Sequence, residues 1–531
     1  MNISAIAPIV AHFARFLGAG DPRSEQAAAL AVLATQAGHV CADLDSEAGW
    51  GPWAPVLDAP QREAFRVCLP GLPIVGGADD WTPLVWDARR LYLRRYFEYE
   101  RRVAADLLAR IATPRQLEAH DEERLAECFA DPGQRAAARI ALTQRLALIS
   151  GGPGTGKTHA LARVIGLLQE TNPQLRIALA APTGKAAARM GEALATAGVS
   201  VDGGARTLHR LLGVRANGHG FHHERGRPLA VDVLVVDEAS MIDLSLMAHL
   251  LDALPETARL ILLGDRDQLA AVEAGAVFAD LCDSARLAAC VALLTKSFRF
   301  GAESGIGQLA ERLRAGDAPG ASVQLRADHG NDLDWQPHGT SPSLIDAARE
   351  GYREYRDGVA AGLPAEELFA RFNRFRVLCA HRQDATAVNR ALTGESLRPA
   401  AGTPLMILRN DPLLRVFNGD IGSALADPAD GQLKCCFPGA PGNEWRWLPL
   451  TRLPAWEPAW AMTVHKSQGS EFERVMLALP NAISPVVTRE LVYTGITRAK
   501  RTVTLRADEA VLRAAIESRA ERMSGLRDRL R

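Results

Sequence analysis

Residues 151–158 read Gly-Gly-Pro-Gly-Thr-Gly-Lys-Thr and directly follow the apolar run Leu146–Ile149. A glycine-rich turn between a strand and a helix, closed by lysine and threonine, is the pattern of a phosphate-binding loop. Its glycines let backbone N–H groups approach a phosphate, Lys157 supplies positive charge, and the Thr158 hydroxyl suits Mg²⁺. We therefore expect an α/β chain that binds a nucleoside triphosphate through Gly151, Gly152, Pro153, Gly154, Thr155, Gly156, Lys157 and Thr158.

A chain of 531 residues is too long for one hydrophobic core, so we expect about two to four domains. Its net charge of −1 confines any nucleic-acid contact to a local basic groove. It has no apolar stretch of the roughly 18 residues that span a bilayer, and no signal-peptide pattern. The eight cysteines form no C-x-x-C pair, and Cys435 and Cys436 fit two faces of one strand. We expect a cytoplasmic protein without a membrane segment or structural zinc.

From about residue 115 to residue 300, apolar runs alternate with helical segments. The runs are Leu146–Ile149, Ile177–Ala180, Val233–Val236 and Leu260–Leu263. This alternation predicts a parallel sheet covered by helices on both faces, in a domain of residues 111–300. Polar motifs follow the runs, as expected where ligands bind at the carboxyl ends of parallel strands.

A second alternating unit follows, with strands expected at Val377–Cys379, Val475–Leu479 and Val503–Leu505. It is interrupted by short strands expected at Met406–Leu408, Ile421–Leu425, Leu433–Phe437 and Trp445–Leu448. Asn418-Gly419 and Asp430-Gly431 fit hairpin turns between them. We therefore expect a small β-barrel of residues 400–458, inserted in a second domain of residues 301–399 and 459–531. Residues 315–345 are rich in Gly, Asp and Pro and predict a loop or crossover.

Residues 1–110 form a separate α+β unit without catalytic features. Glu25–Gln36 and Tyr96–Arg110 predict helices, and Leu84–Trp86 with Leu91–Leu93 predicts a hairpin. Six arginines cluster at Arg89, Arg90, Arg94, Arg95, Arg101 and Arg102. The cluster has two interpretations: a solvated helix face, or a docking surface for a partner or DNA.

Two polar motifs at strand ends point to triphosphate hydrolysis. Asp237 and Glu238 follow Val233–Val236; the first can hold Mg²⁺, and the second can act as general base for the attacking water. Gln268 follows Leu260–Leu263, where an amide can sense the γ-phosphate; the alternative is a polar loop.

Two arginines are candidates for stabilising charge on the γ-phosphate. Arg498, in the second unit, is the candidate arginine finger, and Arg299 is the second cation. The alternative for either is a surface salt bridge. A finger from the second unit would require the cleft between the units to close. Gln134 lies 23 residues before Lys157, and its amide can pair with the adenine edge.

Two stretches are suited to holding a polynucleotide. Residues 181–189 supply Pro182, Thr183 and Lys185, and residues 463–471 supply Thr463 and His465. Short hydroxyls and N–H groups at helix starts bind phosphates without reading bases. His209, in a third stretch, is a candidate for stacking on bases. A structural role is equally open for both histidines.

This motif set, in this order, resembles superfamily 1 helicases from Gln134 to Lys500. Within them the chain resembles the branch that moves 5′→3′ on single-stranded DNA. It is most similar to the RecD family, the alpha subunits of exodeoxyribonuclease V, the RecBCD helicase–nuclease. The stretches that carry the resemblance are Gly38–Cys41, Pro83–Leu93, Gly151–Thr158, Ala181–Met190, Val235–Asp243, Gly264–Gly275, Phe417–Gly422, Ala461–Phe472 and Tyr493–Lys500.

The resemblance implies two RecA-like motor domains with ATP and Mg²⁺ between them, an inserted SH3-like barrel, and an N-terminal partner-docking domain. It implies a candidate strand-separating pin at residues 213–230. The family's roles carry over to Lys157, Thr158, Asp237, Glu238, Gln268, Arg299 and Arg498 at the ATP site, and to Thr183, Lys185, His209, Thr463 and His465 along the DNA.

The implied function is an ATP-dependent 5′→3′ helicase in double-strand break repair and recombination. Single-stranded DNA, duplex DNA ends and RecB- and RecC-like subunits of a heterotrimer are the implied partners, in the cytoplasm at the nucleoid. No separate nuclease cluster stands out, so nuclease activity is expected in a partner chain. The alternatives are a stand-alone helicase of the same branch, a superfamily 1 RNA helicase, and a non-hydrolysing assembly subunit.

Overall fold

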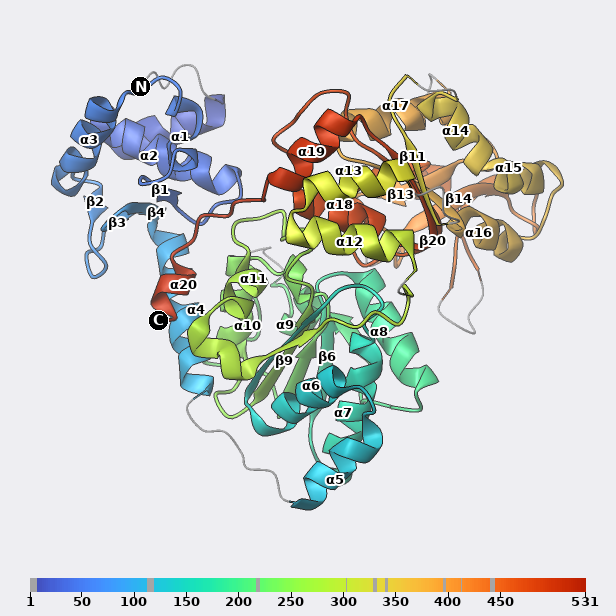
Figure 1. Cartoon of the computed structure of the whole chain (residues 1–531), viewed down its shortest axis with the longest axis horizontal. Coiled ribbons are helices and arrows are strands. Elements are labelled where there is room, and N and C mark those ends of the chain that lie inside the picture. Colours follow the sequence, from blue (N-terminus) through green and yellow to red (C-terminus); the bar gives the residue numbers. More distant parts are fainter. Residues whose placement is uncertain are drawn as a thin grey trace.

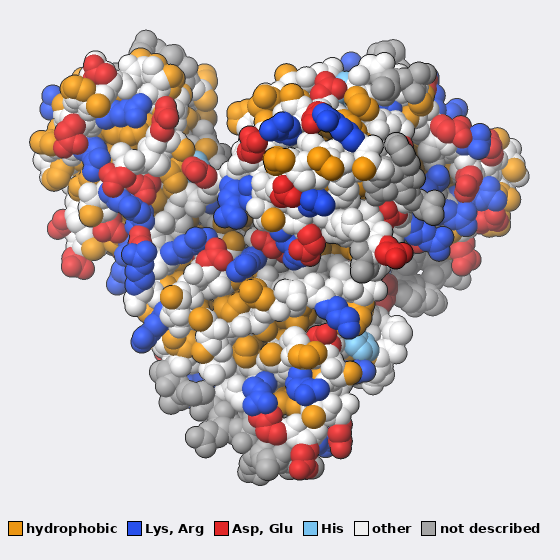
Figure 2. Space-filling model, in the orientation of Figure 1, with side chains coloured by type: hydrophobic (Ala, Val, Ile, Leu, Met, Phe, Trp, Pro, Cys, Tyr) orange, Lys and Arg blue, Asp and Glu red, His pale blue; other side chains and the backbone are white. Residues whose placement is uncertain are grey.

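The computed structural model describes residues 7–111, 119–215, 220–301, 303–327, 332–339, 342–394, 398–411, 413–439 and 445–531. An N-terminal lobe, a first α/β unit and a second α/β unit follow one another along the chain (Figure 1). Figure 2 shows an open gap between the N-terminal lobe and the second unit, with the first unit below both. Among the helices described, none is long and apolar enough to cross a membrane.

The first α/β unit contains a parallel sheet with the strand order β10-β5-β9-β8-β6-β7. Its strands are β5 (Leu146–Gly151), β6 (Ile177–Ala181), β7 (Ala205–Thr207), β8 (Val233–Val236), β9 (Arg259–Gly264) and β10 (Val291–Leu294). The four predicted strands are confirmed. Its helices are α5 (Ala119–Cys128), α6 (Pro132–Thr143), α7 (Lys157–Thr171), α8 (Gly184–Thr196), α9 (Leu208–Leu212), α10 (Leu244–Ala253) and α11 (Val277–Cys282).

Alternate residues of β5, β6, β8 and β9 in this sheet enter different cores. Leu146 and Leu148 of β5 pack in a core with α10 and α11, whereas Ala147 and Ile149 pack in a core with α6, α7 and α8. A strand that is buried on both faces must be apolar at successive positions, which explains the continuous runs in the sequence.

The second α/β unit contains a sheet with the strand order β11-β20-β19-β12-β18, in which the neighbouring strands pair in parallel. Its strands are β11 (Leu333–Gln336), β12 (Phe375–Cys379), β18 (Ala461–Thr463), β19 (Phe472–Ala478) and β20 (Ala499–Arg506). Its helices are α12 (Gly305–Ala315), α13 (Ala318–Ala327), α14 (Leu344–Gly351), α15 (Arg353–Ala360), α16 (Ala365–Asn373), α17 (Arg382–Thr393), α18 (Arg489–Ile496) and α19 (Glu509–Glu517).

Residues 315–345, predicted to form a loop or crossover, are not an irregular loop in the part that the structure describes. The segment contains helix α13 and strand β11, which adds to the edge of the sheet beside β20. Ala318, Ala321 and Leu325 lie at helical spacing and are buried in the core of the second unit. The Gly, Asp and Pro content of the segment masked this periodicity.

The insertion in the second unit is a five-stranded antiparallel sheet with the order β16-β15-β14-β13-β17. Its strands are β13 (Pro404–Ile407), β14 (Ile421–Ala426), β15 (Leu433–Phe437), β16 (Arg446–Pro449) and β17 (Trp456–Pro458). Cys435 enters the core of this sheet, whereas Cys436 enters a core of the second α/β unit. The two cysteines therefore lie on opposite faces of one strand, as predicted, and fix the insertion to the unit that carries it.

The N-terminal lobe has its own core and a small sheet with the order β1-β4-β3-β2. Its elements are α1 (Pro8–Gly18), α2 (Pro22–Gln36), β1 (Ala42–Asp43), α3 (Ala59–Cys68), β2 (Val75–Gly76), β3 (Leu84–Asp87), β4 (Arg90–Leu93) and α4 (Arg94–Arg110). The predicted helices and the hairpin of β3 and β4 are confirmed. Helix α4 leaves this lobe: Val103 and Leu107 lie in the core that α10 shares with the first sheet.

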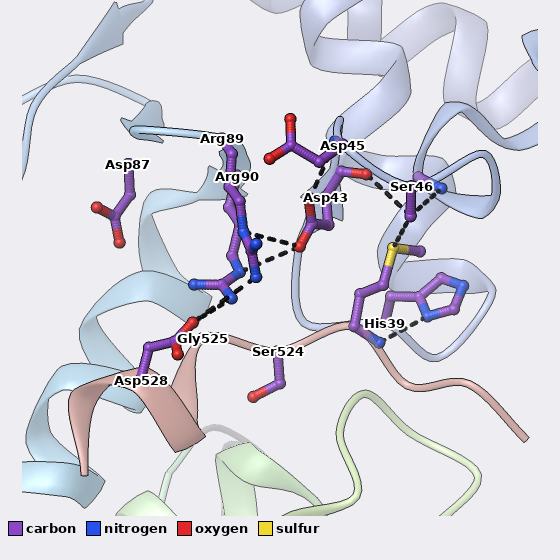
Figure 3. Close-up of polar contacts among 12 residues, drawn as sticks. His39, Asp43, Asp45, Ser46, Asp87, Arg89, Arg90, Ser524, Gly525 and Asp528 are labelled. Carbon is purple, nitrogen blue, oxygen red and sulfur yellow. Dashed lines mark hydrogen bonds and ion pairs between the residues drawn. The ribbon is translucent and has the colours of Figure 1, made fainter. Parts of the chain in front are cut away.

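The C-terminal segment of the chain, residues 519–531, runs from α19 back to α4 (Figure 1). Its short helix α20 (Leu526–Arg529) contacts α4 and α11. Near the lobe, Val40 N–H donates to the Met523 carbonyl (2.8 Å), and Met523 N–H donates to His39 Nδ1 (3.1 Å; Figure 3). The last residues thus pack on the N-terminal lobe and the first unit, although the sequence assigns them to the second domain.

The arginine cluster of residues 89–102 forms contacts within the chain and is not simply a solvated helix face, whereas its role as a docking surface stays a prediction. Arg89 and Arg90 pair with Asp43 and Asp528 (Figure 3). Arg102 pairs with Asp252 on α10 at 2.6 Å. These pairs join β4 and α4 to the C-terminal segment and to the first unit. The sequence hid them because the aspartates lie far away along the chain.

Glu100 of α4 anchors the C-terminal segment. Its carboxylate is fully buried and accepts hydrogen bonds from Ser524 Oγ, Gly525 N–H and Arg529 Nε at 2.8–2.9 Å. We predict that Arg529→Ala lowers the free energy of unfolding by about 3 kcal/mol, because it leaves a buried carboxylate without its cation. Urea denaturation measures this.

The matched control is Arg531→Ala, which removes an arginine that is 82% exposed and paired with Asp528. Its effect should stay within about 0.5 kcal/mol. Equal denaturation midpoints for the two variants would contradict the anchoring role of Arg529.

Candidate functional site

The phosphate-binding loop connects β5 to α7, with Gly154 and Gly156 at φ +80° and +78°. Glycine is needed there because other residues rarely adopt this backbone. At Gly152 a Cβ atom would lie 2.7 Å from the Tyr493 hydroxyl, so the second unit closes directly onto the loop. Lys157 Nζ donates to the carbonyls of Gly151 and Gly152. The loop therefore has the backbone conformation of a phosphate-binding loop, and the Lys157 side chain is hydrogen-bonded to its first two residues.

Asp237 and Glu238 follow β8 at the same edge of the sheet as the phosphate-binding loop. Glu238 has φ +53°, a left-handed conformation that strains a non-glycine residue and is typical of functional sites. Its N–H donates to Asp237 Oδ1 at 2.8 Å. Burial and the neighbouring Glu238 raise the pKa of Asp237, while Lys157 lowers it. A divalent cation would stabilise this charged carboxylate, and the Thr158 hydroxyl lines the same cavity, so the residues fit Mg²⁺.

Most of the predicted ATP-site residues line one cavity of about 470 Å³ between the two α/β units, whereas Gln134, Gly151 and Gly152 are not part of its lining. This volume is in the range of small-molecule sites. The lining includes Pro153, Gly154, Thr155, Gly156, Lys157, Thr158, Arg189, Asp237, Glu238, Gln268, Arg299, Gly469, Glu471 and Arg498. Carboxylates, an amide and cations from both units therefore face one space.

Gln268 and Arg498 are in direct contact across the two units. Arg498 Nη2 donates to Gln268 Oε1 at 2.5 Å, and both side chains are buried. Burial lowers the pKa of Arg498, and the carboxylates Glu238 and Glu471 oppose that effect. The alternatives of a polar loop for Gln268 and a surface salt bridge for Arg498 do not fit this geometry.

Glu471 is a site residue that the sequence interpretation missed. It pairs with Arg299 and Arg189 at 2.6 Å each. Burial would raise its pKa, but Arg189 and Arg299 outweigh burial and hold the pKa at about 2. The sequence pattern assigns the stretch 463–471 to the polynucleotide, whereas the end of this stretch lines the cavity. The sequence did contain a signal for Glu471: a carboxylate at the end of a stretch assigned to phosphate binding needs a cationic partner.

Gln134 and Phe298 flank the phosphate-binding loop. Gln134 is buried, and its Nε2 donates to the Thr155 carbonyl at 3.2 Å. Phe298 is 57% exposed and donates its N–H to the Gly154 carbonyl at 2.7 Å. A Cβ atom at Gly156 would lie 2.5 Å from Gln134 Nε2 and 3.6 Å from Phe298 Cδ2. An exposed ring beside a buried amide offers a stacking face for a base, which the sequence interpretation did not note.

Two of the predicted polynucleotide stretches meet across the units. Thr183 caps α8, and a Cβ atom at Gly469 would lie 3.4 Å from its hydroxyl. Arg189 Nη1 donates to the Gly469 carbonyl at 3.0 Å. Half-buried Pro182 precedes this cap, and Thr463 ends β18.

Three further predicted residues have distinct surroundings. Burial, assisted by Arg376 and opposed by Asp420, lowers the pKa of Lys185 to about 8. Burial and Arg522 lower the pKa of His465. His209 packs on Phe221, with ring centroids 5.8 Å apart.

Phe221 belongs to the candidate pin, residues 213–230, of which residues 216–219 lie outside the described residues. In the described part, Val214 bridges to Phe221 and Glu224 to Arg227. Arg225 binds both carboxylate oxygens of Asp106 at 3.0 Å, which ties the segment to α4.

Three family models match the chain: "RecBCD enzyme subunit RecD, N-terminal domain" over residues 4–92, "AAA domain" over 134–274, and "UvrD-like helicase C-terminal domain" over 458–505. The RecBCD enzyme subunit RecD of Mycobacterium tuberculosis H37Rv is 42% identical, over 97% of this chain and 92% of its own. That of Haemophilus influenzae is 35% identical over 84% and 81%. The ATP-dependent RecD2 DNA helicase of Deinococcus radiodurans is 31% identical over 96% and 69%. The crystal structure of Bacteroides Pif1 bound to ssDNA aligns with 72% of this chain and 94% of that chain, at a TM-score of 0.43 and 17% identity.

We predict that Glu471→Gln slows nucleoside-triphosphate hydrolysis by about tenfold to hundredfold, because Arg189 and Arg299 lose a charge-assisted anchor. Steady-state phosphate release measures this. The matched control is Glu473→Gln, whose partner Arg501 is 79% exposed, and it should hydrolyse at the parental rate. A Glu471→Gln rate equal to that of the control would show that the arginines need no anchor.

Proposed function

The chain belongs to the RecD family of RecBCD enzyme subunits, and from this premise we propose that it is an ATP-dependent 5′→3′ DNA helicase. It acts as the alpha subunit of a RecBCD-type heterotrimer with RecB- and RecC-like subunits, on duplex DNA ends during double-strand break repair and recombination. It works in the cytoplasm at the nucleoid, and nuclease activity resides in a partner chain.

One observation carries this proposal: the cavity between the α/β units draws charged groups from both. Lys157, Asp237 and Glu238 come from the first unit, and Glu471 and Arg498 come from the second. A triphosphate bound there would contact both units, so its hydrolysis changes the force that holds them together. That is the requirement for converting hydrolysis into movement of one unit relative to the other.

We assign roles by the chemistry of each group. Thr158 and Asp237 would hold Mg²⁺, which would neutralise phosphate charge, and Glu238 activates the attacking water. Lys157, Arg299 and Arg498 stabilise charge on the γ-phosphate, and Gln268 senses it. Gln134 and Phe298 hold the adenine by hydrogen bonding and stacking.

We assign the DNA path to the two stretches whose ends meet at Gly469, beside the nucleotide cavity. Pro182, Thr183 and Lys185 hold the strand on the first unit, Thr463 and His465 hold it on the second, and His209 lies along the same path. Hydroxyls and cations bind the phosphate backbone, so translocation is independent of sequence and sensitive to salt. The insertion of residues 400–458 is an SH3-like barrel, and residues 213–230 are the strand-separating pin.

A stand-alone 5′→3′ helicase is the second candidate, since a RecD2 helicase is among the relatives. Sequence identity favours the subunit: this chain is 42% identical to the tuberculosis RecD subunit and 31% identical to the RecD2 helicase. Unwinding by the chain alone at the same rate as with RecB- and RecC-like partners would favour the stand-alone helicase.

We predict ATP-dependent opening of a duplex with a 5′ single-stranded tail and not of one with a 3′ tail. Lys157→Gln should reduce hydrolysis by about 100-fold or more, because a donor to the phosphates is lost. A strand-displacement assay, run with the chain alone and with its partners, measures both. Opening of the 3′-tailed duplex by the chain alone would contradict the polarity and the SH3-like assignment.

We also propose that the N-terminal lobe docks a partner subunit through the outer face of α1. Ile9, Phe13 and Phe16 are 70%, 38% and 77% exposed and lie at positions i, i+4 and i+7 of this helix. Such spacing places them on one face, and a contiguous apolar stripe is typical of an interaction surface. The occupant is a RecBCD-type partner, since the family model that matches this lobe is that of a subunit of a complex.

We predict that Phe16→Asp lowers recovery of the chain in a pull-down with RecB- and RecC-like subunits by about tenfold or more. The control is Val67→Asp on α3, at a site that is 71% exposed outside α1. Point substitutions are preferable to deleting residues 1–110, since α4 belongs to the core of the first unit. Equal recovery of both variants would rule out docking through α1.

A further inference from the structure

The loop that carries Gln268 is held by several side chains of the second unit. The N–H of Leu269 donates to Thr494 Oγ1 at 2.9 Å, and its carbonyl accepts from Gln468 Nε2 at 2.8 Å. These two bonds fix the backbone beside Gln268. They do not fix the orientation of the Gln268 side-chain amide.

Asp265 controls that orientation. Its Oδ2 accepts a hydrogen bond from Gln268 Nε2 at 3.0 Å. With Nε2 committed to a carboxylate, Oε1 must face the Arg498 guanidinium, as observed. A flipped amide would set an oxygen against the carboxylate and an N–H against the guanidinium, and both contacts are repulsive.

Tyr493 holds Asp265 from the second unit. Its hydroxyl donates to the same Oδ2 atom at 3.0 Å. Burial, and next the neighbouring Asp265, raise the pKa of Tyr493, so the hydroxyl keeps its proton and remains a donor. Asp265, Gln268, Tyr493 and Arg498 are only 2–7% exposed. Water therefore does not replace a lost partner easily, and each bond counts for more than it would at the surface.

These contacts form a chain that starts in the second unit at Tyr493, crosses the first unit through Asp265 and Gln268, and returns to the second unit at Arg498. Because both ends lie on one side of the cleft, the whole chain exists only when the units are this close. Tyr493 is also the residue whose hydroxyl touches the phosphate-binding loop at Gly152.

We infer that Tyr493 is a positioning residue for hydrolysis: through Asp265 it orients the Gln268 amide so that its oxygen meets Arg498 when the cleft closes. This inference rests on the proposed function, since it assigns Tyr493 to the ATP site described there. Two different interactions then position the loop of Gln268. Thr494 and Gln468 fix its backbone at Leu269, whereas Tyr493 and Asp265 fix the orientation of the Gln268 side chain.

The test is Tyr493→Phe in the full chain with single-stranded DNA. The ring is kept and one hydrogen bond is lost, so we expect kcat for ATP hydrolysis to fall by about fivefold to tenfold, with KM changed by less than about twofold. The control is Tyr355→Phe, a buried tyrosine of the second unit whose hydroxyl bonds Gly402 and Ser423 instead. Equal kcat for the two variants would overturn the inference.

A double-mutant cycle distinguishes positioning from a general loss of stability. If Tyr493 acts through Gln268, then adding Tyr493→Phe to Gln268→Ala changes kcat no further. A full second decrease would mean that Tyr493 acts independently, and the inference would be wrong. Lys157→Gln distinguishes failure of the proposed function from failure of this inference. If Lys157→Gln leaves hydrolysis intact, the proposed ATP site is wrong. If Lys157→Gln is inactive but Tyr493→Phe hydrolyses at the parental rate, only the role of Tyr493 is wrong.

Discussion

The parallel pairing of β5, β9 and β8 is the constraint on which the site depends. Ile149 lies beside Leu263, and Val236 lies beside Leu262, so the three strands end at one edge of the sheet. These strands are followed, respectively, by the phosphate-binding loop, the loop that carries Gln268, and Asp237 with Glu238. Since each strand is buried on both faces, a shift in register would place polar motif residues in a core. Burial of apolar runs thus brings together groups that are 80 and more residues apart in sequence.

The site at this edge of the first sheet is completed by Arg498, which comes from the second unit. A buried guanidinium is unfavourable unless acceptors surround it. Its hydrogen bonds go to the carbonyls of Thr494 and Ser470 and to Gln268 Oε1, and the last of these belongs to the other unit. A γ-phosphate in the cavity would add the negative charge that these neutral oxygens lack. A triphosphate should therefore favour the closed cleft more than a diphosphate does, which gives the nucleotide a differential affinity for two arrangements of the units.

The parts of the site that lie within contiguous motifs were predictable from sequence: the phosphate-binding loop, Asp237 and Glu238, and the strands before them. Glu471, Asp265 and Tyr493 were not assigned, although their motifs were recognised, because their roles follow from partners in the other unit. Tyr493 and Asp265 are 228 residues apart. Helix α13 and strand β11 were missed because Gly, Asp and Pro outweighed a short buried periodicity. The C-terminal segment could not be foreseen, since its bonds to Glu100, His39 and Arg90 depend on a path that no local pattern encodes.

Through that segment, all three parts of the chain contact the loop of residues 268–275, which begins at Gln268. Arg522 donates to the carbonyl of Ala37 in the N-terminal lobe and to that of Ala271, which follows Gln268 in the first unit. Gly275 N–H, in the same loop, donates to the Gly38 carbonyl at 3.0 Å. Arg522 itself extends from the second unit and lies close enough to His465 to lower its pKa. The loop that carries Gln268 is thus bonded at one end to the second unit and at the other to the N-terminal lobe. The contact with the lobe is a backbone–backbone hydrogen bond, whereas those with the second unit join the backbone of the loop to the side chains of Thr494 and Gln468. The N-terminal lobe and the loop of Gln268 are therefore joined by hydrogen bonds at Gly275 and through Arg522.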